Sequence, residues 1–124
     1  MPESFNILCV DDDKDFCDLI TVMLRYADTD YKLTAVATPQ EALDLLAHKS
    51  FDLFMFDYNL PHMTGVELCR RIRSTDSKTP IVFYTGTSED DDRRAALEAG
   101  ANAYLIKPND IDNIVATIKN LLNN

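Results

Sequence analysis

The chain has 124 residues, and its 12 basic and 21 acidic residues give a net charge of −9 at neutral pH. This length suits one domain, and a hydrophobic content of 46% is typical of a globular chain and excludes a disordered one. A surface this acidic repels phosphate backbones and anionic membranes, so we expect neither nucleic acid nor a membrane as a direct partner.

The three cysteines occur without a CxxC motif or a Cys/His cluster, so the sequence gives no indication of a zinc site. Cys9 and Cys17 lie within apolar patterns and are predicted to be core residues in a reducing compartment. The first residues do not form a basic stretch followed by a long apolar run, and no apolar run reaches transmembrane length. We therefore expect a soluble, cytoplasmic protein.

Five short apolar runs alternate with segments of helical pattern. They lie at residues 6–10, 32–37, 51–56, 80–85 and 103–106. Most are apolar on both faces, which is typical of strands in a parallel sheet that helices cover on both sides.

Helical spacing of apolar residues follows the first two runs. After the first run, the apolar positions are Phe16, Leu19, Ile20 and Met23. The second helix opens with Thr38-Pro39-Gln40-Glu41, a capping box with proline at the first helical position.

Three further helices follow the later runs. The third contains Leu68 and Ile72, and the fourth follows Ser88 and ends near Gly100, a residue type that stops helices. The last begins at about Asp110. Five alternations of strand and helix predict an α/β fold with a doubly wound five-stranded parallel sheet. Because no linker interrupts the pattern, we expect residues 1–124 to form one domain, with a core from about 6 to 122 and no attached output domain.

Polar side chains follow four of the five predicted strands. They are Asp11, Asp12 and Asp13 after the first strand, Asp57 after the third, Thr85 at the end of the fourth and Lys107 after the fifth. Ligands of open parallel sheets bind beyond these carboxyl ends. Clustered carboxylates repel one another, and a hard cation such as Mg²⁺ relieves the repulsion. With a lysine and a hydroxyl nearby, the set has the parts needed for phosphoryl transfer.

Four segments in this order resemble the receiver domain of two-component response regulators, in particular single-domain regulators of the chemotaxis type. The segments are ILCVDDD, FDLFMFDYNLPHMTG, VFYTG and AYLIKP, and the spacing of Asp57, Pro61 and Gly65 is the most specific piece. The resemblance extends from about Asn6 to Leu122. It implies a flavodoxin-like (βα)5 fold with strand order 2-1-3-4-5.

The resemblance also implies a chemistry. Asp57 would be the phosphoacceptor, taking a phosphoryl group from a phosphohistidine. Mg²⁺ or Mn²⁺ would be bound by Asp12, by Asp57, by the backbone carbonyl of Asn59 and, through a water, by Asp11. The domain would be a regulatory phosphoacceptor and not an enzyme, with metal-dependent self-phosphorylation and slow self-dephosphorylation as its only activities.

Further residues gain roles from the same resemblance. Lys107 would pair with Asp57 before the reaction and with the phosphoryl group afterwards, and the Lys107–Pro108 bond would be cis. Thr85 would move to the phosphoryl group, and Tyr104 would swing inward into the space that Thr85 leaves. This would change the face made by the fourth helix, fifth strand and fifth helix. Asn59 and Thr87 occupy positions at which the family tunes hydrolysis of its phosphoaspartate.

Some charged residues have simpler explanations. Asp13 is expected to cap the first helix, which we prefer to a ligand role. The acidic run 89–92 is explained by the helix dipole, with solvated carboxylates. Arg70, Arg71 and Arg73 are expected to form a solvated face, with a docking role left open.

Other functions fit the sequence less well. Aspartyl-phosphate hydrolases of the haloacid dehalogenase type share a D-x-D-x-T pattern, but here Asn59 and Pro61 replace its second acid and its threonine. A docking module without phosphorylation normally lacks one of the key residues, and all are present here. A nucleotide-binding flavodoxin-like protein needs a glycine-rich or hydroxyl-rich first loop, which is missing.

The leading hypothesis is a phosphorylation-controlled signalling switch. Its partners would be a histidine kinase or histidine phosphotransfer protein and a downstream protein target, with a phosphorylation-dependent homodimer left open. The alternatives are an intermediate in a phosphorelay and a receiver fragment of a larger response regulator or hybrid kinase.

Overall fold

A computed structural model describes residues 4–27 and 30–123 of the chain. Five parallel strands form one sheet with the order β2-β1-β3-β4-β5, which confirms the predicted flavodoxin-like topology. The strands are β1 (Phe5–Val10), β2 (Tyr31–Val36), β3 (Leu53–Phe56), β4 (Ile81–Thr85) and β5 (Ala103–Ile106). The predicted single domain also included residues 1–3, 28–29 and 124, which lie outside the described residues.

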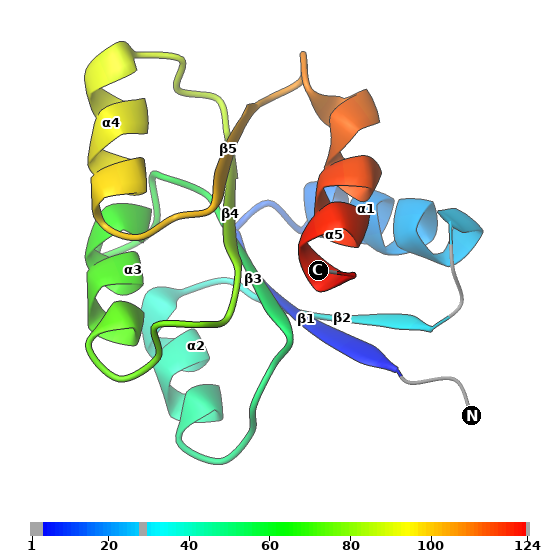
Figure 1. Ribbon diagram of the computed structural model, residues 1–124, viewed down its shortest axis with the longest axis horizontal. Helices are drawn as coiled ribbons and strands as arrows, with labels where there is room; N and C mark the ends of the chain where they lie inside the picture. Colours follow the sequence, from blue (N-terminus) through cyan, green and yellow to red (C-terminus); the bar gives the residue numbers. More distant parts are fainter. Residues whose placement is uncertain (1–3, 28–29, 124) are drawn as a thin grey trace.

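Helices cover both faces of the sheet (Figure 1). They are α1 (Lys14–Ala27), α2 (Pro39–Leu46), α3 (Gly65–Arg73), α4 (Asp90–Glu98) and α5 (Ile114–Leu122), with a 3₁₀ turn, η1 (Ile111–Asn113), before α5. Figure 1 shows α1 and α5 on one face and α2, α3 and α4 on the other. Every residue of β3 and β4 is buried, because each of these strands meets a helical layer on both faces. None of the described helices is long and apolar enough to cross a bilayer.

Two predicted caps are confirmed. The amide of Glu41 donates to Thr38 Oγ1 at 3.2 Å, and Pro39 is the first residue of α2. Beyond α4, Gly100 has a φ of 113°, which glycine adopts without strain. Cys9 and Cys17 are buried thiols, as predicted, with their sulfur atoms 3.8 Å apart.

Three local predictions are wrong. Leu19 does not belong to the buried stripe of α1, since it is 44% exposed and Cys17 and Leu24 are buried instead.

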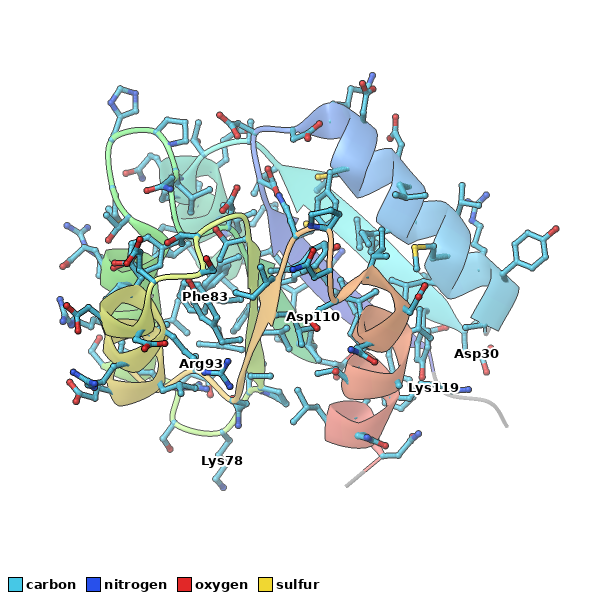
Figure 2. All side chains as sticks on the ribbon, turned by 90° about the horizontal axis from the view of Figure 1, so that it is seen from above. Asp30, Lys78, Phe83, Arg93, Asp110 and Lys119 are labelled. Atoms are coloured by element: carbon cyan, nitrogen blue, oxygen red, sulfur yellow. The ribbon has the colours of Figure 1, made fainter. Side chains whose placement is uncertain are left out.

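The last helix does not begin at Asp110. The carboxylate of Asp110 accepts the Ile106 amide at 2.8 Å, so the chain turns there, and α5 begins at Ile114 after η1. Figure 2 labels Asp110 at this junction.

Arg73 is the third correction, because it is not part of a solvated arginine face. Its Nε and Nη2 donate to the carbonyl oxygen of Gly100 at 3.0 and 2.9 Å, and Nη1 donates to the carbonyl of Asp76 at 3.0 Å. Nη2 also reaches Asn102 Oδ1 at 3.0 Å. Arg73 therefore joins the end of α3 to the turn between α4 and β5, whereas Arg70 pairs with Glu67 at the surface.

Candidate functional site

Three carboxylates meet beyond the carboxyl ends of β1 and β3. Asp11, Asp12 and Asp57 each place an oxygen within 4.8 Å of the other two. The sheet fixes this arrangement, since the amide of Asp57 donates to the Val10 carbonyl at 3.1 Å and the amide of Asp11 to the Val36 carbonyl at 3.0 Å. Strand pairing thus extends one residue past each strand and sets both carboxylates side by side.

The carboxylates differ in exposure. Asp11 is buried, Asp57 is half-buried and Asp12 is exposed. Burial raises the pKa of Asp11, and this is partly offset by hydrogen bonds from Lys107 and the Asp13 amide. The amide of Asp13 lies 2.9 Å from Asp11 Oδ1, while the Asp13 carboxylate accepts the Phe16 amide at 3.2 Å. The side chain of Asp13 therefore caps α1, as the sequence predicted.

Lys107 brings a positive charge to this cluster from the end of β5. Its Nζ donates to Asp11 Oδ2 at 2.7 Å and to Asp57 Oδ2 at 3.5 Å, and it lies 4.2 Å from the centroid of the Phe16 ring. Burial lowers the pKa of Lys107, but these carboxylates outweigh it and the net pKa is raised. The Lys107–Pro108 bond is cis. The Lys107 amide donates to the Thr85 carbonyl at 2.8 Å.

The donor set fits a hard divalent cation. The three carboxylates offer only oxygen atoms, and Lys107, whose ammonium group is the only one that pairs with them among the described residues, leaves negative charge uncompensated. Asn59, whose carbonyl the resemblance adds to this set, is exposed in the loop after β3. That loop closes where the Gly65 amide donates to the Tyr58 carbonyl at 2.7 Å.

Thr85 is the last residue of β4, and Tyr104 is the second residue of the neighbouring strand β5. Thr85 is 1% exposed, and its Oγ1 accepts the Thr87 amide at 3.5 Å, which leaves its hydroxyl proton available to another acceptor. Tyr104 is buried against Phe83, with ring centroids 5.9 Å apart and planes 19° apart. Its hydroxyl donates to the Thr87 carbonyl at 2.9 Å. Tyr104 is thus buried and bonded to the loop that follows β4.

Sequence reasoning missed two residues around the site. Asp92 was expected to be solvated with its acidic neighbours, but its Oδ2 accepts the Thr87 hydroxyl at 2.6 Å. Gly65 was noted only as part of a motif. A Cβ there would lie 2.3 Å from the Asp57 carbonyl oxygen, so glycine is required for the loop to return against the end of β3. Neither contact has a short-range pattern that reveals it in the sequence.

The chain is similar in sequence to known proteins. A family described as "Response regulator receiver domain" matches residues 7–119. The response regulator ArlR of Staphylococcus epidermidis is 35% identical over 117 residues, which are 94% of this chain and 52% of that protein. The chain therefore spans about half the length of the curated relatives it matches.

Solved structures agree in fold. A putative response regulator from Chloroflexus aurantiacus has a TM-score of 0.89 and 31% identity, covering 98% of this chain and 100% of that one. The receiver domain of the sensor histidine kinase PA1611 from Pseudomonas aeruginosa has a TM-score of 0.84 and 28% identity, covering 98% and 99%. That structure has a magnesium ion coordinated in its active site cleft.

Proposed function

The chain belongs to the response regulator receiver domains of two-component signalling, and from this premise we propose that it is a switch controlled by phosphorylation of Asp57. The observation that carries the proposal is the meeting of Asp11, Asp12 and Asp57 with Lys107 at one edge of the sheet. A cation site and an ammonium group beside one half-buried carboxylate suit that carboxylate to receive a phosphoryl group.

In the proposed reaction, a carboxylate oxygen of Asp57 attacks the phosphorus of a phosphohistidine on a partner. The new O–P bond forms as the P–N bond breaks, and the imidazole leaves with the electron pair and takes up a proton. Lys107 already lies 3.5 Å from Asp57 Oδ2, so its ammonium group is placed to pair with the transferred phosphoryl group. The hydroxyl proton of Thr85 is available for the same group.

The carboxylates of Asp11, Asp12 and Asp57 lie close enough together to share one Mg²⁺ ion. Asp12, Asp57 and the Asn59 carbonyl would hold it, and Asp11 would act through a water. When bound, the cation would neutralise charge on the phosphoryl oxygens during transfer. Asp11 and Asp57 also hold Lys107 in place.

The phosphorylated state would reach a partner through α4, β5 and α5. Phosphorylation adds roughly −1.5 to −2 charges beside Thr85 and Lys107, which biases a two-state element. Tyr104 on β5 and Thr87 before α4 already share a hydrogen bond, so a shift of the loop between β4 and α4 changes that face. The upstream partner would be a histidine kinase or a histidine phosphotransfer protein, and the downstream partner a protein that reads this face.

The direct test is the intact mass of the protein after incubation with acetyl phosphate and Mg²⁺. The expected result is the gain of one phosphoryl group, with no gain when EDTA replaces Mg²⁺ or when Asp57→Asn replaces the wild type. Asp13→Asn is the matched control, because it removes the same charge from the same region while its amide oxygen can still accept from Phe16.

A second measurement covers the case of a receiver that accepts phosphate only from its own kinase. Beryllofluoride with Mg²⁺ mimics the phosphorylated carboxylate without any kinase, and we expect it to bind. Asp12→Asn is expected to weaken Mg²⁺ binding by at least about tenfold, since removing a metal ligand should cost no less than removing an outer-shell partner. Absence of both the mass gain and beryllofluoride binding in the wild type would refute the proposal.

A further inference from the structure

A carboxylate of α4 binds the loop between β4 and α4 (residues 86–89). Thr87 Oγ1 donates to Asp92 Oδ2 at 2.6 Å, a length typical of a strong bond between a hydroxyl and a charged acceptor. Asp92 lies in the first turn of α4 and is half-buried. The bond therefore fixes the side chain of the loop residue against the rigid helix.

The same loop residue contacts both residues of the proposed switch. The Thr87 carbonyl accepts the Tyr104 hydroxyl at 2.9 Å, and the Thr87 amide donates to Thr85 Oγ1 at 3.5 Å. The hydroxyl of Thr87 thus binds Asp92, its carbonyl binds Tyr104, and its amide binds Thr85. A change in the position of Thr87 must move or break the contacts of both Tyr104 and Thr85.

Asp92 also lies near the residue that follows the proposed phosphoacceptor. Burial and the nearby charge of Asp92 raise the pKa of Tyr58, which directly follows Asp57. The Tyr58 ring lies 6.2 Å from that of Phe83, on which Tyr104 stacks. Figure 2 shows Phe83 on the side of the sheet that carries α4. Asp92 therefore binds the loop after β4 and lies near the chain that follows β3.

Asp91, its neighbour in the same turn, makes none of these contacts. Its side chain is 93% exposed and pairs with Arg94 on the helix surface. The acidic run at the start of α4 therefore contains one carboxylate that faces the switch loop beside one that faces solvent.

We propose that Asp92 is a positioning residue, which holds Thr87 so that Tyr104 stays buried and Thr85 is ready for the phosphoryl group. The inference rests on the proposed function of Asp57. Only molecules with the loop in the arrangement that binds the ligand contribute to binding. The apparent affinity is therefore the intrinsic affinity multiplied by the fraction of molecules in that arrangement. Removing the Asp92 carboxylate lets the loop adopt other arrangements and lowers that fraction.

The first arm of the test needs no ligand. The protein is labelled with 3-fluorotyrosine, and the ¹⁹F resonance of Tyr104 is assigned by its loss in Tyr104→Phe. Asp92→Ala and Thr87→Val are each expected to shift or broaden this resonance. Thr87→Ser keeps the hydroxyl and is expected to restore the wild-type signal, and Asp91→Ala, which makes the same charge change, is expected to leave it in place.

The second arm measures the affinity for beryllofluoride in the presence of Mg²⁺. Asp92→Ala and Thr87→Val are each expected to lower it by about three- to tenfold, which falls within the usual net contribution of one protein hydrogen bond. Because the two residues form one bond, the double variant is expected to lose little more than either alone. Thermal unfolding of each variant checks that it is folded.

The proposal would be overturned if both Asp92→Ala and Thr87→Val left the Tyr104 resonance and the affinity for beryllofluoride unchanged. So would equal effects of Asp91→Ala, because these would arise from charge and not from position. If the wild type neither gained a phosphoryl group nor bound beryllofluoride, the proposed function would fail, while the ¹⁹F spectra would still decide whether Asp92 positions Tyr104.

Discussion

Lys107 is bound more closely to Asp11 than to Asp57, with its ammonium nitrogen 2.7 Å from Asp11 Oδ2 and 3.5 Å from Asp57 Oδ2. Asp11 is buried, so this pair is shielded from the solvent that weakens surface ion pairs. The ammonium group of Lys107 therefore compensates negative charge on the same carboxylates that would bind a divalent cation.

Lys107→Met is accordingly expected to raise the affinity for Mg²⁺ at neutral pH by about three- to tenfold, because a positive charge leaves the vicinity of the carboxylates. Isothermal titration calorimetry measures this directly. Lys119→Met removes the same charge from the surface of α5 (Figure 2) and serves as the control. Weaker or unchanged Mg²⁺ binding in Lys107→Met alone would show that the lysine does not compete with the cation.

Gly65→Ala is expected to destabilise the protein by about 1–3 kcal/mol, the usual cost of overpacking. The added Cβ would meet the Asp57 carbonyl oxygen at 2.3 Å and Phe83 Cε2 at 2.9 Å, and the backbone of Asp57 cannot yield without moving the site. Urea unfolding gives the free energy.

Gly86→Ala is the matched control for this change. An added Cβ at Gly86 has nothing within 4 Å, so we expect the free energy of unfolding to change by less than about 1 kcal/mol. Equal stabilities for the two variants would mean that the approach of Gly65 to Asp57 is not a close one in solution.

Arg73→Met is expected to lower the free energy of unfolding by about 1–3 kcal/mol, because it leaves the carbonyl of Gly100 without its donors. Arg70→Met, on the same helix, removes the same charge from a side chain that is 61% exposed. We expect that change to stay within about 0.5 kcal/mol. Chemical denaturation of both variants compares them, and a loss of similar size in each would assign the effect to charge.

Tyr104 makes stability depend on pH at the alkaline end. Burial raises the pKa of Tyr104 to about 12, so the folded state keeps its phenol proton over a range in which the unfolded chain loses it. The stabilisation is fully present below the ordinary tyrosine pKa of about 10 and is lost as the pH rises towards 12. Burial also raises the pKa of Tyr58 and Tyr84, which adds to the same trend.

Urea unfolding across this alkaline range is therefore expected to show a smaller decline for Tyr104→Phe than for the wild type. The near-ultraviolet absorbance of tyrosinate gives an independent readout, in which Tyr104→Phe removes a late-titrating group. Tyr26→Phe changes a tyrosine that is 92% exposed and is expected to leave the late phase in place. A late phase that survives Tyr104→Phe undiminished would contradict the burial of this phenol.

Much of the fold was predictable because its signals are local. Continuous apolar runs marked the strands, and β5 was predicted at its observed limits, Ala103–Ile106. The last helix was predicted from about Asp110, whereas the carboxylate of Asp110 binds the amide of Ile106 four residues earlier and the 3₁₀ turn η1 precedes α5. Arg73 was misjudged for a related reason, since its acceptor, Gly100, lies 27 residues further along the chain in the turn between α4 and β5.

In the candidate site, too, some features were predictable from the sequence and others were not. Topology requires the carboxyl ends of parallel strands to share an edge, so the grouping of Asp11, Asp57 and Lys107 followed from their places after three strands. Asp92 could not be found this way. Helix-dipole reasoning treats all acids of a first turn alike, and only the packed loop distinguishes Asp92, bonded to Thr87, from Asp91 in solvent.

β5 forms one edge of the sheet and is hydrogen-bonded to β4 alone among the described strands. A domain can open locally in one structural unit while the remainder stays folded. A brief detachment of β5 would carry Lys107 away from Asp11 and Asp57 without disturbing β1 or β3. The charge balance of the carboxylate cluster therefore depends on the free energy of this local opening, which amide hydrogen exchange along β5 reports separately from global unfolding.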